Sequence, residues 1–146
     1  MKKILLEILL GVGLSSAIFH TQVTGLFTTE KPANKEINFS IARDSSYDCN
    51  VYDMTSATIQ VIVFKVKDHK QIVLWNKTYD TMQVKQYPTT SNALRQTVKV
   101  KNILDRKEQL FVTYIITYNT KGSVIKVENG TSVLKGGKEG RLAIII

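Results

Sequence analysis

The sequence predicts a small all-β domain, an immunoglobulin-like β-sandwich of about 8 strands, because apolar residues recur at alternate positions along most of the chain. Turn signals built on Gly, Asn, Asp and Pro separate these short alternating stretches. After the N-terminal segment, no stretch keeps an apolar stripe at helical spacing over three turns. Because small barrels share this pattern, a small open β-barrel is the alternative fold.

The composition is that of one folded domain. The chain has 146 residues, of which 43% are hydrophobic and 22% are charged, and these values are near the globular average and far from those of disordered chains. A chain of this length builds a single hydrophobic core. Cys49 is the only cysteine, so the chain cannot form an intramolecular disulfide and its stability must come from packing.

Residues 1–25 have the parts of a secretory signal peptide in the usual order. A cationic start precedes an apolar run and a zone of small residues. Cleavage sites fit after Ala17 and after Gly25, and the second is preferred because it leaves the whole apolar segment in the discarded peptide. The protein is therefore expected to be secreted, with Leu26 as its first residue.

The rival interpretation is an uncleaved N-terminal segment that tethers the protein to a membrane. A membrane-spanning helix needs about 20 predominantly apolar residues. The apolar run here ends near Phe19 and contains Glu7. We therefore expect no stable membrane anchor.

The first part of the secreted chain is predicted to be irregular. Residues 26–35 are rich in Thr, contain Pro32 and lack periodicity, so we expect a flexible entry segment. A single domain then spans residues 36–146. Its first strand is expected over residues 36–42, where apolar and polar residues alternate, and a weaker strand candidate covers residues 49–54.

Residues 58–67 and 71–79 are predicted to form a hairpin, joined by a turn at residues 68–70. The first of these stretches is apolar at both sets of alternating positions. A central strand covered on both faces has this pattern, and so has a strand with a bulge. At its end, Lys65 and Lys67 alternate with apolar neighbours and are expected to face away from the core.

A short edge strand is expected over residues 82–86, ended by Pro88 and a polar cluster. The next strand, over residues 94–101, alternates clearly. Its apolar residues are expected to face the core, and Lys99 and Lys101 are expected to face outward.

The strongest strand signal covers residues 109–119, where five apolar or aromatic residues share one face. The dipeptide Asn129-Gly130 is a type I′ turn signal and predicts a hairpin between strands over residues 123–128 and 131–135. Residues 141–146 alternate again. We expect them to form a packed final strand, because a free apolar tail promotes aggregation.

No catalytic, metal-binding or nucleotide-binding motif stands out, so a non-enzymatic protein without cofactor or metal is expected. His69 is the one histidine outside the leader, and Cys49 has no informative spacing to it. Asp44, Asp48 and Asp53 cluster in a loop-rich segment. This cluster has two interpretations. Two of the carboxylates could act as a catalytic pair for glycoside hydrolysis, or the aspartates cap turns through hydrogen bonds to the backbone, and the second interpretation is favoured.

The charge balance points to anionic partners. The chain has 20 Lys and Arg against 12 Asp and Glu, a formal net charge of +8, which favours association with polyanions such as cell-wall polymers. No run of cations is dense enough for a nucleic-acid arm, so no nucleic-acid partner is expected. If their two strands share one sheet, Lys65, Lys67, Lys99 and Lys101 form one polyanion-binding surface.

Three classes of function remain. The leading one is a secreted, non-enzymatic binding module that presents a face or loops to an anionic cell-wall polymer or to a protein partner. The second is a secreted protein inhibitor or immunity-type factor that acts through a loop, either 43–54 or 87–93. The least favoured is a membrane-active toxin, because the sequence lacks a long hairpin that alternates small polar and apolar residues.

Overall fold

The computed structural model describes residues 30–46, 53–133 and 135–146. Every strand described lies in one compact unit, Pro32–Ile146. The elements are β1 (Ala33–Ala42), β2 (Thr55–Lys67), β3 (Lys70–Thr78), β4 (Met82–Gln83), the 3-10 helices η1 (Val84–Gln86) and η2 (Thr90–Asn92), β5 (Leu94–Ile103), β6 (Glu108–Thr120), β7 (Ser123–Val133) and β8 (Glu139–Ile145). The predicted leader, its cleavage site and Cys49 lie outside the described residues.

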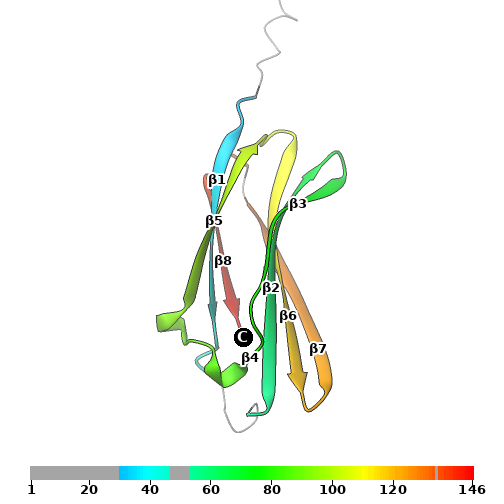
Figure 1. Cartoon of the computed structure of the whole chain (residues 1–146). Helices are drawn as coiled ribbons and strands as arrows, with labels where there is room; N and C mark the ends of the chain where they lie inside the picture. The colour runs from blue at the N-terminus through cyan, green and yellow to red at the C-terminus, as the bar shows by residue number, and fades with distance from the viewer. Residues whose placement is uncertain (1–29, 47–52, 134) are drawn as a thin grey trace, which may run out of the picture. The chain divides into compact units, whose positions relative to one another are not determined.

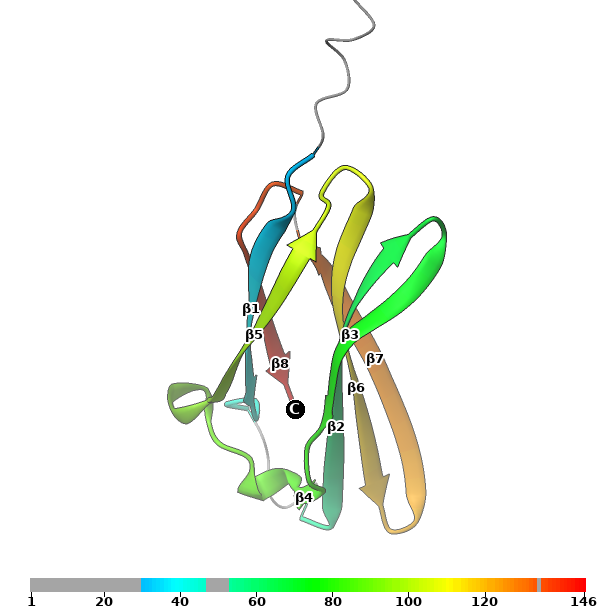
Figure 2. The ribbon, with the colours of Figure 1, turned by 45° about the horizontal axis from the view of Figure 1, so that its top comes forward.

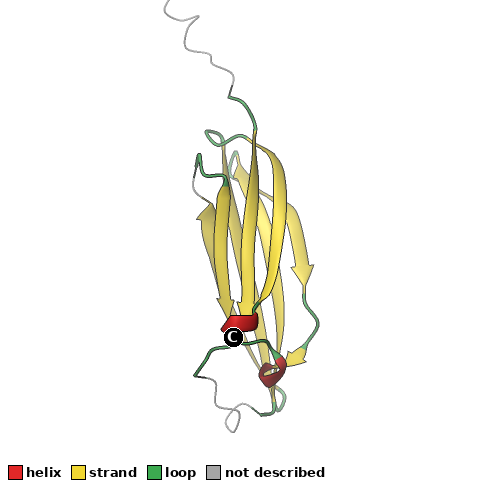
Figure 3. Ribbon diagram, turned by 90° about the vertical axis from the view of Figure 1, so that its left-hand side faces the viewer, coloured by secondary structure: helices red, strands yellow, loops and turns green. Residues whose placement is uncertain are grey.

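The strands form two sheets that face each other (Figure 1). One sheet has three strands in the order β5-β1-β8, and the other has five, in the order β3-β2-β6-β7 with β4 paired to β2. Neighbouring strands are antiparallel, except that β8 runs parallel to β1. Figure 3 shows both 3-10 helices at the end of the sheets where β8 finishes. The predicted all-β sandwich of about 8 strands is confirmed.

The core lies between the two sheets and follows the alternation of the sequence. Val61 and Val63 of β2 and Val112 of β6 are fully buried, whereas their neighbours along each strand face outward. The rings of Phe39 in β1 and Trp75 in β3 pack between the sheets, with centroids 5.7 Å apart. Each buried side chain of this size contributes roughly 1.5–3 kcal/mol, so packing alone can hold the two sheets together without a disulfide.

The hairpin of β2 and β3 is confirmed. Its turn residues Asp68 and His69 both have positive φ, of 49° and 61°, as a type I′ turn requires. A bulge is present, but it lies in β3: the register of the pair shifts between Val63 and Phe64 of β2. Phe64 faces outward and stacks on Phe111 of β6, with ring centroids 5.2 Å apart. The two-sided apolar pattern of β2 therefore reflects a core face and an aromatic cluster on the outer face.

The hairpin predicted at Asn129-Gly130 is wrong, because β7 runs through this dipeptide without a turn. Gly130 lies opposite Thr113 of β6. A Cβ at Gly130 would be 2.6 Å from Thr113 Cγ2 and 2.7 Å from the carbonyl oxygen of Val112. Glycine is needed here because the two strands approach closely, not because the chain reverses.

Two segments have a different secondary structure from the one expected. β1 begins at Ala33, so residues 33–35 belong to the strand rather than to a flexible entry segment. The edge strand expected over residues 82–86 keeps only Met82 and Gln83, and the chain continues as η1. The final strand is confirmed as β8, with Ile144 fully buried.

Candidate functional site

The four lysines predicted to form one surface lie in different sheets. Lys65 and Lys67 are in β2 of the five-stranded sheet, whereas Lys99 and Lys101 are in β5 of the three-stranded sheet. The assumption that their strands share a sheet is therefore wrong, and the structure does not bring the four cations together.

The expected outward orientation of Lys65 and Lys67 is also wrong. In the ladder with β6, Lys65 lies opposite Leu110 and Lys67 opposite Glu108, and both of these partners are buried on the core side. Residues directly opposed in an antiparallel pair share one face of the sheet. Both lysines therefore lie on the core-facing side of β2, where the sequence pattern placed Phe64 instead.

Lys65 is engaged in a partly buried ion pair. Its Nζ donates to Glu108 Oε1 at 2.8 Å, and the two side chains are 17% and 3% exposed. The backbone N–H of Leu104 donates to the other oxygen of the Glu108 carboxylate at 3.0 Å. Burial by itself raises the pKa of Glu108, but these two hydrogen bonds outweigh it and hold that pKa below its ordinary value. Lys65 thus has a structural role.

A second buried lysine lies in a segment that was expected to be flexible. The side chain of Lys35 in β1 is 1% exposed, and its Nζ lies 2.5 Å from Asp105 Oδ1. Burial favours a higher pKa for Asp105, but the hydrogen bonds from Lys35 and from the N–H of Gly136 lower it overall. Asp105 and Glu108 both flank the turn between β5 and β6. The carboxylates beside one turn therefore bind a lysine from each sheet.

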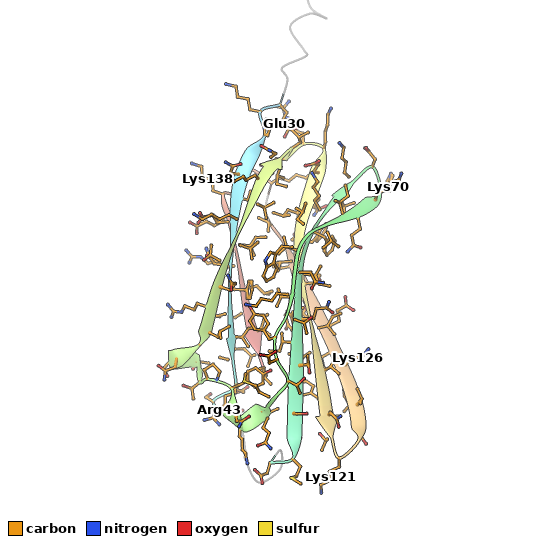
Figure 4. All side chains as sticks on the ribbon, in the orientation of Figure 1. Glu30, Arg43, Lys70, Lys121, Lys126 and Lys138 are labelled. Carbon is orange, nitrogen blue, oxygen red and sulfur yellow. The ribbon has the colours of Figure 1, made fainter. Side chains whose placement is uncertain are left out.

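Five of the exposed cations lie on the outer face of the three-stranded sheet. Lys99 and Lys101 point outward from β5, as expected, and are exposed. Three further exposed cations lie with them: Arg95 on β5, Lys138 just before β8, and Arg141 on β8. Figure 4 shows Lys138 on the side of the sheet that faces away from the core. We call these five residues the basic face.

The pairing of β1 with both of its neighbours sets the spacing of the basic face. Asn38 of β1 lies between Thr97 and Arg141, and Ser40 lies between Arg95 and Ala143. Neighbouring strands are about 4.8 Å apart, so cations on β5 and β8 lie on opposite sides of a strip of small polar residues. A hollow of about 530 Å³ covers this strip, lined by Asn38, Phe39, Ser40, Arg95, Gln96, Thr97, Arg141, Leu142 and Ala143.

Two carboxylates on this face offset only part of the positive charge. Glu36 lies 3.5 Å from Lys99, and Glu139 lies 3.4 Å from Arg141. The side chains of the two cations are 73% and 83% exposed, and such exposed pairs contribute at most about 1 kcal/mol. An anionic ligand can therefore displace these carboxylates at small cost.

At one end of the sandwich, the first residue of one loop considered for an inhibitor pairs with the other loop. The N–H of Arg43 donates to the carbonyl of Pro88 at 2.8 Å, and Arg43 forms an isolated parallel bridge with Thr89. Both loops were predicted from the sequence, but the contact between them was not. Residues 47–52 of the first loop lie outside the described residues.

The two aspartates of this segment that the structure describes have structural partners. Asp44 accepts hydrogen bonds from the backbone N–H and the hydroxyl of Ser46, at 2.8 and 2.9 Å, and these bonds lower the pKa of Asp44. This geometry caps a turn, as the favoured interpretation expects. Asp53 forms an ion pair with Lys85 at 2.6 Å, and Asp48 lies outside the described residues.

No family model, curated protein or solved structure matches this chain. Within the ranges that the structure describes, no three His, Cys, Asp or Glu residues are grouped in a way that could hold a metal ion. In the same ranges, no helix has the length and apolar character needed to cross a bilayer. The case for a function therefore depends on the surface of the sandwich itself.

Proposed function

We propose that this protein is a secreted, non-enzymatic binding module with an immunoglobulin-like scaffold, which associates with an anionic cell-surface polymer through its basic face. One observation supports this proposal above the others. Five exposed cations from β5 and the β8 region share one sheet face with only two carboxylates. A rigid sheet holds these cations at fixed positions, so they act together on one extended ligand.

The physical basis is electrostatic attraction to closely spaced anions. Surface charges act over a Debye length of roughly 8 Å at physiological salt. Residues two apart along a strand, such as Lys99 and Lys101, have backbone positions about 7 Å apart. Several cations therefore act on adjacent anionic groups of a polymer at once. Arg95 and Arg141 line the same hollow, and a planar guanidinium can bind a phosphate or carboxylate with two parallel hydrogen bonds.

The proposal predicts that charge reversal on the basic face abolishes polymer binding. The test variant is Arg95→Glu/Lys99→Glu/Lys101→Glu/Arg141→Glu, and affinity for long-chain polyphosphate is measured at low salt. Each cation near an anionic surface contributes about 1 kcal/mol, so the affinity should fall by roughly 100-fold or more. Binding of the wild type should weaken steeply as salt increases.

A matched control separates the basic face from net charge. The variant Lys70→Glu/Lys77→Glu/Lys107→Glu/Lys121→Glu changes four exposed lysines elsewhere and has the same formal net charge as the test variant. Most of its polymer binding should remain. If both variants lose affinity equally, the diffuse charge of the protein is responsible and the proposed face is wrong.

A protein partner bound by loops is the second candidate function, and the contact between Arg43 and the segment Pro88-Thr89 favours it. Two loops held together at one end of a rigid scaffold form a continuous recognition surface. If a partner from the cell surface still binds the basic-face variant but is lost when Ser91 and Asn92 are replaced with Lys, this candidate is the correct one.

A further inference from the structure

β7 is an unprotected edge of the five-stranded sheet. It is the last strand in the order β3-β2-β6-β7, and Figure 2 shows it at one edge of that sheet, beside β6. All of its 11 residues except Val133 are exposed, none is a proline, and its ladder with β6 shows no register shift. Edge strands of this length are normally shielded by prolines, bulges, covering segments or charged side chains, because their free N–H and C=O groups pair with other chains. Within the part of the chain that the structure describes, β7 has only one of these devices, its charged side chains Lys126 and Glu128.

We propose that a second copy of this chain pairs with this edge, antiparallel and about a two-fold axis at Val127, to give a homodimer with one continuous sheet. In such a symmetric antiparallel pair, the residue numbers of every two directly opposed residues have the same sum. Centring the axis on Val127 overlaps residues 123–131 of the two copies. Three features of β7 select this register.

The first feature is charge. With the axis at Val127, Lys126 of each copy lies opposite Glu128 of the other, so the dimer contains two opposite-charge pairs on its outer face. An axis at Lys126 or at Glu128 would instead place like charges directly opposite each other, which is destabilising. The two charged side chains of β7 thus favour the register centred on Val127 and disfavour the registers centred on Lys126 and on Glu128.

The second feature is the fit of a side chain to a hollow. Val124 is 57% exposed on the outer face, and in this register it lies opposite Gly130 of the second copy. Gly130 has no side chain, and a hollow of about 380 Å³ lies over it, lined by Phe111, Thr113, Glu128, Asn129, Gly130, Thr131 and Ser132. The exposed side chain of Val124 in one copy therefore lies over the hollow at Gly130 of the other.

The third feature is uncovered apolar surface on the inner side of β7. Ile125 and Val127 lie opposite Tyr118 and Ile116 of β6, on the core-facing side, yet they are 64% and 43% exposed. They line a cavity of about 480 Å³ between the sheets, together with Tyr118 and Ile146 among others. In the proposed dimer Val127 of one copy lies directly opposite Val127 of the other, which removes the Val127 part of this apolar surface from water.

The proposal is tested by exchanging the two charges. In Lys126→Glu the dimer would contain two Glu–Glu contacts, and in Glu128→Lys it would contain two Lys–Lys contacts. Each single variant should dimerise at least about tenfold more weakly than the wild type in sedimentation equilibrium. The double variant Lys126→Glu/Glu128→Lys restores both opposite-charge pairs and should recover the wild-type dissociation constant. A mixture of the two single variants should form heterodimers for the same reason.

If net charge alone controlled dimerisation, the expected effect of one variant would have the opposite sign, and this difference gives an internal control. Lys126→Glu lowers the positive charge of the protein and would strengthen dimerisation if only general repulsion mattered. Lys70→Glu makes the same change away from β7 and should leave the dimer intact. Circular dichroism checks that each variant is folded. A wild type that stays monomeric at millimolar concentration overturns the proposal, as do folded single variants that dimerise normally or fail to form heterodimers when mixed.

Discussion

Replacing Lys65 with Met is expected to lower the free energy of unfolding at pH 7 by about 3–5 kcal/mol, because it leaves the Glu108 carboxylate buried without its cation. The carboxylate is 3% exposed and would keep the hydrogen bond from Leu104 and the weaker effect of the Lys67 charge. A small domain has a total stability of about 5–15 kcal/mol, so a loss of this size is severe. Urea unfolding monitored by circular dichroism measures it.

The same variant should respond to pH in a characteristic way. In the wild type the pKa of Glu108 lies below its ordinary value of 4.5, so the stabilisation from its ionised form is present at neutral pH and is lost as the pH falls through the folded-state pKa. In Lys65→Met, Glu108 loses the hydrogen bond and the charge of Lys65, so its pKa rises relative to that in the wild type, and the cost of burying the carboxylate disappears when the carboxyl is protonated. The difference in stability between the two proteins should therefore narrow between pH 7 and about pH 4.

A double variant gives the control for this prediction. Lys65→Met/Glu108→Leu removes both charges and should be more stable than Lys65→Met alone, because no carboxylate is left buried. Lys67→Met changes the neighbouring lysine on the same face and should have a smaller effect. If Lys65→Met is as stable as the wild type at pH 7, the ion pair has no structural role. The sequence-based prediction that Lys65 binds polyanions would then need to be reconsidered.

Replacing Ile144 with Ala should destabilise the protein by about 2–5 kcal/mol, since the change leaves a cavity in the core. Ile144 is fully buried in β8, which closes the three-stranded sheet by pairing with β1. For a domain of this size the melting temperature should fall by about 10–20 °C. Differential scanning calorimetry measures the change.

The adjacent residue gives a matched control. Ile145 is 42% exposed on the other face of β8, and Ile145→Ala should cost less than about 1 kcal/mol. Equal losses at the two positions would mean that the strand is not packed as described. Small losses at both positions would also contradict the sequence-based expectation that residues 141–146 form a structural strand.

Period-two alternation predicted the strands whose two faces differ most. In β6 one face is buried along most of the strand and the other is only partly buried, and the bounds of the strand differ from the expected residues 109–119 by one residue at each end. The pattern fails where an outer face is itself apolar. In β2, Phe64 stacks on Phe111 on the outer face, and taking Phe64 as a core residue assigned Lys65 and Lys67 to the wrong side.

Local turn signals were reliable only where no strand pairing competed with them. At Asp68 and His69 the chain reverses with positive φ at both residues, as expected from their polar character. At Asn129-Gly130 the same kind of local preference yields to an uninterrupted ladder of 11 residues with β6. Pairing of β7 with a long neighbour therefore outweighs the intrinsic preference of one dipeptide.

The candidate site was predicted only in part, for a topological reason. The alternation in β5 correctly indicated that Lys99 and Lys101 face outward. Arg141 joins them because β8 pairs in parallel with β1 on the side opposite β5. This arrangement links the last strand to the first, and no local sequence pattern encodes it. Lys35 was missed for a related reason, since its partner Asp105 lies 70 residues away in the chain.

The central claim is that the basic face binds an anionic polymer, and residue-level mapping tests it most directly. Titration of isotope-labelled protein with polyphosphate at low salt, followed by amide chemical shifts, should perturb β5, β8 and the intervening residues of β1 most strongly. The perturbed set should include Arg95, Lys99 and Arg141 and should revert as salt is added. Shifts spread evenly over all exposed lysines, or concentrated on β3 and β7 instead, would contradict the claim.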